Sequence, residues 1–285
     1  MTELAGQRVP RVGLGLARPF LGEPADDQAV ECLIDHALET GIRFIDTARA
    51  YTPSGADGHG ETVLGRVLRR RGELTGLVVS TKGGHFRDGE RFYIDARPAA
   101  LRLDCEASLR RLRLDRLELY SLHHPDPHVP LEESIGALHE LRRAGLIRSI
   151  GVCNVTVEQL DEATRVTEID AVQHAYSITD RTNELLVKRC ATLNIPFVAY
   201  SPLGGTRRTF PLDTISPTAT TLANELSVDA ASVLIAWLLS RGEGVLALSG
   251  ASRPGSLDSS LAALEIELTA EDRSNIDAEL SWSAA

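Results

Sequence analysis

Eight short apolar runs recur along the chain, and a longer stretch with apolar residues every three or four positions separates most of them. The apolar runs are residues 12–16, 43–48, 77–82, 117–123, 148–154, 171–177, 197–201 and 245–250. Their Val, Leu and Ile residues are nearly continuous, which is typical of strands buried on both faces. The longer stretches have the period of a helix with one buried face, as in residues 31–41, 61–70, 108–114 and 230–241. Alternating strands and helices predict a parallel sheet, and eight such units predict a closed (β/α)₈ TIM barrel.

The main alternative fold is an open, doubly wound sheet that binds a dinucleotide through a G-x-G-x-x-G turn. Residues 13–19 read GLGLARP and show no helix start after them, so the barrel is favoured. No low-complexity linker divides the 285 residues, and barrels of about 250 residues form single domains. We therefore predict one domain over residues 1–285. Its last helix is capped by Thr269, with Glu271 and Asp272 in its first turn.

Charge and cysteine use restrict the partners and the compartment that we expect. A formal net charge of -10 argues against nucleic acid and anionic membrane surfaces as partners. The four cysteines form no CxxC pair, which favours reduced thiols. The first residues lack the pattern of a signal peptide, and no apolar run approaches the roughly 20 residues that span a bilayer. We expect a cytoplasmic protein that acts on a small molecule.

Four reactive side chains fall at or just after the ends of three consecutive predicted strands. Asp46 ends the second strand, Tyr51 follows it by five residues, Lys82 ends the third strand and His123 ends the fourth. The carboxyl ends of barrel strands build the active site in this fold, so the four side chains are predicted to converge.

These four residue types suit proton transfer to a carbonyl oxygen. A tyrosine hydroxyl has an ordinary pKa of about 10, too high for an efficient acid at neutral pH. An adjacent ammonium such as that of Lys82 lowers this pKa, and Asp46 behind it would keep the lysine charged and oriented. His123 is placed to hydrogen-bond the carbonyl oxygen and to fix which face of the substrate reacts.

At these residues the sequence resembles the aldo-keto reductase superfamily. DTARAY (46–51) followed by GHGETVLGRVL (58–68), STKGG (80–84) and LELYSLHHPDP (117–127) are similar to the family's catalytic segments. RSIGVCN (148–154), AVQHAYS (171–177), AYSPLGG (199–205) and VLALSGASRP (245–254) are similar to its later signatures, in the family's order. The resemblance covers essentially the whole chain and implies an oxidoreductase with Tyr51 as general acid/base, supported by Asp46, Lys82 and His123.

The resemblance also implies a nicotinamide cofactor, with hydride exchanged between its C4 and a carbonyl or alcohol carbon of an aldehyde, ketone or sugar. It implies Asn154 and Gln173 on the carboxamide and Tyr200 stacked on the ring. The other implied cofactor contacts are Ser201, Pro202, Leu203, Gly204, Gly250, Ser252, Arg253 and Ser256. Three departures concern the cofactor: Cys153 replaces a usual Ser, Ser249 a usual Pro, and Ser259 and Ser260 a usual Glu-Asn pair.

Arg253 decides which form of the cofactor we expect. The family counterpart of the segment around Ser252 and Arg253 surrounds the 2′-phosphate of NADP, and a guanidinium pairs well with a phosphate. A second basic residue of some branches is replaced here by Ser256. We therefore expect a modest preference for NADP(H), with NAD(H) still used.

The remaining polar residues have plainer interpretations. His124 and Phe86 are candidates for the substrate pocket, whereas His85 and the other scattered histidines are expected to be structural or exposed. We expect no metal site, because the two prolines in HHPDPH (123–128) disrupt a helical face and no further ligand cluster is evident at another strand end. Arginines such as Arg111 are interpreted as solvated helix faces.

Two other functions stay open at this point. One is a cofactor-binding regulatory barrel with little turnover, against which the complete set of four residues argues. The other is a sugar isomerase or dehydratase that uses the nucleotide transiently. The short loop after the fourth strand (125–130) and the short tail (281–285) predict an open pocket for a sugar or a functionalised metabolite.

Overall fold

The computed structural model describes residues 1–21, 26–53, 56–205 and 211–281, and its centre is a closed barrel of eight parallel strands. The order around the barrel is β3-β4-β5-β8-β9-β10-β11-β12, and β12 pairs with β3 to close it. All eight predicted strands are confirmed. Their bounds are β3 Val12–Gly15, β4 Phe44–Asp46, β5 Val78–Gly83, β8 Leu117–Leu122, β9 Ile147–Cys153, β10 Ala171–Ala175, β11 Phe197–Tyr200 and β12 Val245–Ser249.

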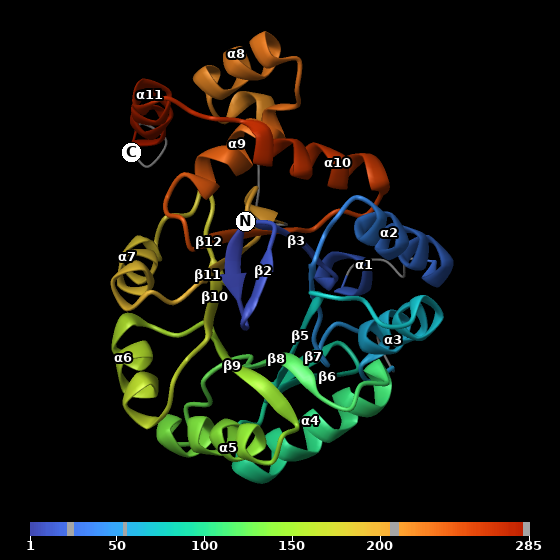
Figure 1. Ribbon diagram of the computed structural model, residues 1–285. Helices are drawn as coiled ribbons and strands as arrows, with labels where there is room; N and C mark the ends of the chain where they lie inside the picture. Colours follow the sequence, from blue (N-terminus) through green and yellow to red (C-terminus); the bar gives the residue numbers. More distant parts are fainter. Residues whose placement is uncertain (22–25, 54–55, 206–210, 282–285) are drawn as a thin grey trace.

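Helices form a ring outside the barrel (Figure 1). They are α1 Ala17–Leu21, α2 Asp27–Glu39, α3 His59–Arg71, α4 Pro98–Leu112, α5 Leu131–Arg143, α6 Val157–Val166, α7 Glu184–Leu193, α8 Pro217–Leu226, α9 Ala230–Leu239, α10 Pro254–Ala262 and α11 Ala270–Ser281, with short 3₁₀ turns at Leu212–Thr214 and Ala263–Glu265. The Thr269 cap is confirmed, because its hydroxyl accepts from the Asp272 N–H at 3.1 Å. The expectation that no helix starts after residues 13–19 was wrong: α1 begins at Ala17, although it has only five residues.

The core has two layers. The larger lies between the barrel wall and the helices, and the smaller fills the barrel interior with residues such as Phe44, Val78 and Leu246. Gly13 belongs to this interior, because a Cβ there would meet the Phe44 ring at 2.5 Å. The barrel is therefore a packed core and not a channel.

Two hairpins were not predicted. The first joins β1 Thr2–Leu4 to β2 Gln7–Val9 through Ala5 and Gly6, which both have positive φ. It lies across the centre of the ring in Figure 1, and its Leu4 and Val9 pack into the barrel interior. It closes the end of the barrel where the strands begin, so the opposite end is left for a site.

The second hairpin follows β5 directly and belongs to that opposite end. It joins β6 His85–Asp88 to β7 Arg91–Ile94, with Gly89 (φ +56°) in the two-residue turn. The sequence did not lead us to expect a hairpin beside the site. Most of the tail that was expected to leave the pocket open, residues 282–285, falls outside the described part of the chain.

In the described part of the chain, no single helix is long and apolar enough to cross a bilayer. Only α8 and α9 taken together meet that length and composition, and they are bent by 110° at their junction.

Candidate active site

The four side chains predicted to converge meet at the carboxyl end of three neighbouring strands. Asp46 is the last residue of β4, Lys82 is the second-to-last residue of β5 and His123 follows β8 directly. These strands pair in that order. Tyr51 comes from the loop between β4 and α3, and its ring centroid lies 5.8 Å from that of His123. Strand order thus brings together residues that are 77 positions apart in the sequence at most.

Lys82 and Asp46 form a buried ion pair below the tyrosine. The Lys82 Nζ donates to both Asp46 carboxylate oxygens, at 2.8 and 2.7 Å, and to the Thr47 carbonyl oxygen at 2.8 Å. Only 1% of the lysine and 2% of the aspartate is exposed. The three bonds use all three ammonium protons, so the charge of Lys82 is fixed in place 4.9 Å from the centroid of the Tyr51 ring.

Burial and charge act in opposite directions on the tyrosine. Burial raises the pKa of Tyr51 well above its ordinary value, while Lys82 acts to lower it. We expected the effect of the lysine to dominate. It has the expected sign, but burial is the stronger effect. Burial acts to lower the pKa of Lys82, but the charge and hydrogen bond of Asp46, together with Tyr51 and Cys153, act against it, and the lysine pKa lies above its ordinary value. Lys82 is therefore a fixed cation and Tyr51 a protonated phenol at neutral pH.

The histidines at the site are uncharged at neutral pH. Burial lowers the pKa of His123 well below its usual range, and the nearby Lys82 charge adds to this. His124 stacks on His123 with ring centroids 5.0 Å apart and is half-buried, and its assignment to the substrate pocket stays a prediction. A neutral imidazole keeps one N–H donor, which is what hydrogen bonding to a carbonyl oxygen requires.

The hairpin contributes His85, not Phe86, to this cluster. His85 lies edge-on to both His123 and His124, with ring centroids 4.7 Å apart in each case. Side chains alternate between the two faces of a strand, and Phe86 packs instead on Tyr93 and on the guanidinium of Arg49. Of these two residues, His85 is the one that contacts His123 and His124, and the assignment of Phe86 to the substrate pocket stays a prediction.

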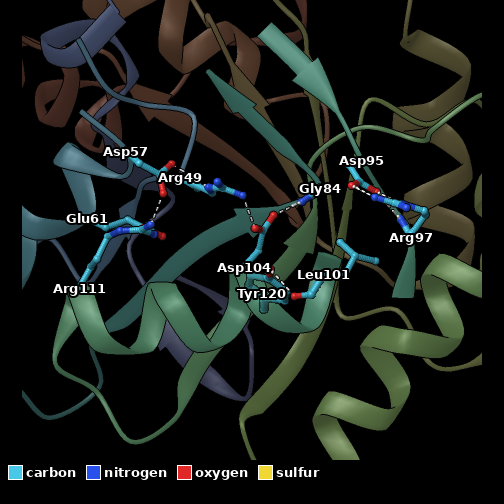
Figure 2. Close-up of polar contacts among 10 residues, drawn as sticks. All are labelled: Arg49, Asp57, Glu61, Gly84, Asp95, Arg97, Leu101, Asp104, Arg111 and Tyr120. Carbon is cyan, nitrogen blue, oxygen red and sulfur yellow. Dashed lines mark hydrogen bonds and ion pairs between the residues drawn. The ribbon is translucent and has the colours of Figure 1, made fainter. Parts of the chain in front are cut away.

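A chain of ion pairs fixes the loop that carries Tyr51 (Figure 2). Arg49 donates to Asp57 at 2.8 Å and pairs with Asp104 of α4, whose other oxygen accepts from the Gly84 N–H at 2.9 Å. Arg111 pairs with Asp57 in turn. Tyr51 thus lies between two anchored positions, and Asp104 connects its loop to the end of the lysine strand.

The same chain of ion pairs continues to a buried carboxylate in α3. Arg111 donates to Glu61 at 2.9 Å, and the Thr81 hydroxyl donates to the same carboxylate at 2.6 Å. The interpretation of Arg111 as a solvated residue was wrong, because only 17% of its side chain is exposed.

The residues expected to hold the nicotinamide end of a cofactor adjoin the four. Asn154 donates to the His123 carbonyl oxygen at 2.9 Å and accepts from the Tyr200 hydroxyl at 2.8 Å. Gln173 donates to Asp46 at 3.3 Å and accepts from the thiol of Cys153 at 3.4 Å. The Cys153 thiol replaces the usual Ser as a donor, and burial raises its pKa to about 12, so it keeps its proton. These amides form one polar band beside Tyr51.

The residues expected to hold the phosphate end surround the beginning of α10. Ser252 and Arg253 are exposed, and a Cβ added at Gly250 or at Gly255 would meet no atom within 4 Å. Among the described residues, no side chain caps this helix, and its first residue, Pro254, has no N–H. The Ser256 N–H donates to the Arg253 carbonyl oxygen at 3.2 Å, so an anion at this helix start would be met mainly by the Gly255 N–H and the Arg253 guanidinium. Ser256 accepts from Arg253 at 3.2 Å. An open, cationic helix start fits the phosphate of a dinucleotide.

The loop after β11 carries further residues that were expected to contact the cofactor. Residues 201–205 form a tight turn in which the Gly204 N–H donates to the Ser201 carbonyl oxygen at 2.8 Å, and this turn includes Pro202 and Leu203. Two of the departures noted in the sequence bind each other: the hydroxyls of Ser249 and Ser260 are 2.8 Å apart.

His85, Arg49 and Asp104 are the site residues that sequence reasoning missed. His85 is found through the hairpin, and part of the signal for that hairpin was present: the turn pair Asp88-Gly89 is followed by Phe92, Tyr93 and Ile94, which favour a strand. Arg49 lies in a quoted motif, but its partner Asp104 is 55 residues away on a helix and has no local signature.

A (β/α)₈ barrel that carries Asp, Tyr, Lys and His in this arrangement at its carboxyl face is the architecture of an aldo-keto reductase. The family model described as "Aldo/keto reductase family" matches residues 11–280. The chain therefore belongs to the aldo/keto reductase family and is an oxidoreductase.

Individual relatives agree with this family. The chain is 32% identical to pyridoxine 4-dehydrogenase of Escherichia coli, with 96% of each chain covered. Among solved structures, a thermostable aldo-keto reductase in complex with the inhibitor epalrestat has a TM-score of 0.84 and 32% identity, with 98% of each chain covered. An aldo-keto reductase of Klebsiella pneumoniae in complex with NADPH has a TM-score of 0.80 and 30% identity, covering 95% of this chain and 90% of that one.

Proposed function

We propose that this protein is an NADP(H)-dependent carbonyl reductase of small aldehydes, ketones or sugars, with Tyr51 as its general acid/base. The observation that carries the proposal is the buried Lys82–Asp46 pair directly beside Tyr51 and His123. When bound, the cofactor supplies or accepts the hydride. Everything else that the reaction needs is a proton donor, an aligned oxygen and exclusion of water, and these tasks fall to the protein.

The protein side of the reaction follows from the charges. In reduction, Tyr51 gives its hydroxyl proton to the carbonyl oxygen, and the fixed charge of Lys82 stabilises the phenolate that remains. Neutral His123 donates a hydrogen bond to the same oxygen and so sets the angle at which the substrate lies. In the oxidation of an alcohol the phenolate takes the proton back. Asp46 holds the lysine in place in both directions of the reaction.

Asn154, Gln173 and Tyr200 support the nicotinamide end in this proposal, and Ser252 and Arg253 the phosphate end. The NADPH bound by the K. pneumoniae relative supports the choice of NADP(H). The exposed guanidinium of Arg253 at an uncapped helix start supports the preference over NAD(H), because it pairs with a phosphate that NAD lacks.

The test is a steady-state screen that follows nicotinamide absorbance in both directions. Aldehydes, ketones and sugars are offered with NADPH or NADH, and alcohols with the oxidised cofactors; pyridoxine is included because a relative is named for it. We expect turnover that requires Tyr51 and is faster with NADPH at limiting cofactor. Product formation without a net absorbance change would instead favour an isomerase or dehydratase. Cofactor binding without turnover across the panel would favour a regulatory barrel.

A further inference from the structure

Three imidazole rings from two different loops meet at the carbonyl end of the candidate active site. His123 and His124 follow β8, and His85 begins the hairpin after β5. One ring nitrogen of each lies within 4.8 Å of one ring nitrogen of each of the other two. The sequence analysis set a metal aside because it found no third ligand, and the structure supplies that ligand from the neighbouring strand.

The spacing of the rings is that of imidazoles around one ion. The ring centroids are 4.7, 4.7 and 5.0 Å apart. A Zn–N bond of about 2.0–2.1 Å places an imidazole centroid roughly 3.2 Å from the metal, and tetrahedral angles then separate two centroids by about 5 Å. The nitrogens, which lie within 4.8 Å of one another, must approach to about 3.4 Å. Rotation of each ring about its soft Cβ–Cγ bond moves the nitrogens while the ring centroids shift little.

Two of the three rings carry a buried nitrogen that has no partner among the described residues. The Nδ1 atoms of His85 and His123 are buried and form no hydrogen bond there, although buried polar atoms are normally paired. His124 Nε2 has one long contact, at 3.4 Å from Asn154 Nδ2. Burial also lowers the pKa of all three rings, to about 4 for His85, and the neutral imidazole is the form that binds metals.

The charges around the rings permit a dication. Lys82 is the nearest cation, but its charge is matched by Asp46 at 2.7 Å. The side chains in contact with the rings are otherwise neutral: Tyr51 faces His123, Phe92 stacks on His85 and Asn154 touches His124. Three neutral nitrogens with no carboxylate favour Zn²⁺, Cu²⁺ or Ni²⁺ over Mg²⁺ or Ca²⁺.

We propose that His85, His123 and His124 form a binding site for a divalent transition metal ion, such as Zn²⁺, that closes the active site. Three protein ligands leave the fourth tetrahedral position for water. An ion held there takes the Nε2 or Nδ1 lone pair of His123 and occupies the space in which a carbonyl oxygen would lie. Metal and substrate therefore exclude each other, and this inhibitory consequence rests on the proposed function, whereas the binding does not.

Binding is measured on tag-free protein that has been stripped of metal with a chelator. Co²⁺ is the probe, because tetrahedral coordination gives it strong visible absorption bands, and Zn²⁺ is then added to displace it. We expect one Co²⁺ per chain, released by one Zn²⁺. His85→Gln and His124→Gln should each weaken binding by more than the roughly 10–100-fold that loss of an outer-shell partner costs. His128→Gln is the matched control, since this exposed histidine lies in the same loop as His124.

The kinetic arm uses wild type and the same variants with NADPH and the best substrate of the screen. Zn²⁺ should compete with the carbonyl compound, and His85→Gln should reduce its inhibitory potency as much as it reduces Co²⁺ binding. Thermal melts confirm that each variant is folded. A wild type without the visible bands, or His85→Gln binding Co²⁺ as tightly as wild type, would overturn the site. Turnover that Zn²⁺ leaves unchanged would overturn the proposed inhibition and leave the reductase proposal intact. Metal binding by a protein without turnover would overturn the reductase proposal and leave the metal site intact.

Discussion

At the scale of single residues, burial and charge have opposite effects on the pKa of the Tyr51 phenol. Burial raises the pKa of Tyr51, which protects the proton that it is to donate, and Lys82 acts against this so that the proton can leave. Neither effect alone makes a good acid, because a buried phenol without a cation holds its proton too tightly.

Tyr51→Phe separates the proton from the ring. The ring stays, so cofactor affinity measured by nicotinamide fluorescence should remain close to wild type, whereas kcat should fall by about 10²–10⁴-fold, the usual worth of general acid catalysis. A variant that keeps near-normal kcat on a good substrate would show that another group supplies the proton.

Lys82→Met removes the charge but keeps a long side chain. The phenol loses the group that lowers its pKa, so this pKa rises further. Alcohol oxidation needs the phenolate, which exists above the pKa, and the rising limb of its pH-rate profile should therefore move to higher pH. A profile that falls in height at an unchanged pH would mean that Lys82 positions Tyr51 without changing its acidity.

At the scale of elements, the loop between β4 and α3 is held by a contact with α4, which comes later in the chain. Asp104 of α4 binds Arg49 beside Tyr51 and the Gly84 N–H beside Lys82, and only 4% of it is exposed. We therefore propose that Asp104 is a positioning residue that holds the loop of Tyr51 and the end of the Lys82 strand in fixed relative positions.

Asp104→Asn tests this link. The amide oxygen can still accept from Gly84, but the charge that holds Arg49 is lost, so we expect a loss of about 1–3 kcal/mol in unfolding free energy. A misplaced Tyr51 should also lower kcat by roughly ten- to a hundredfold with less change in KM. Chemical denaturation and steady-state kinetics measure both. Asp115→Asn, an exposed site just past α4, is the control, and equal effects of the two variants would refute the positioning role.

The elements also show what the sequence could predict. Every barrel strand was predicted because a parallel strand buried on both faces has an unmistakable apolar run, and Asp46, Lys82 and His123 were located because they end such runs. The hairpin β6–β7 was missed because its strands have only four residues each and are exposed or half-buried, so they lack the long buried apolar run of a barrel strand. His85 was misjudged for the same reason: its role comes from a fold of the chain that brings it to β8, not from its neighbours in sequence.

At the scale of the whole molecule, a chain with net charge -10 must attract a polyanionic cofactor. A general negative field opposes that approach, so a local cation at the cofactor site has to carry the attraction. Arg253, exposed at the start of α10, is suited to this task.

Arg253→Ala should weaken NADPH binding by about 1.5–3 kcal/mol, the worth of a charge-assisted hydrogen bond, which is about one to two decades in Kd. NADH binding should hardly change, and the preference of the wild type for NADPH should shrink as salt rises. Fluorescence titration with both cofactors measures this. Arg165→Ala, an exposed arginine on α6, is the control, and wild-type affinities that are equal for NADH and NADPH would show that Arg253 does not read the phosphate.

The seam between β12 and β3 governs how a newly made chain acquires this shape. Ala247 pairs with Val12 and Ser249 with Leu14, so the bonds that complete the barrel join segments more than 230 residues apart. During synthesis seven strands are made while β3 and β11 still expose unpaired edges, the kind of surface on which chains aggregate. Such distant pairing is slow to form. The barrel can therefore close only after β12 has left the ribosome. Until then, chaperones can bind the unpaired edges of β3 and β11.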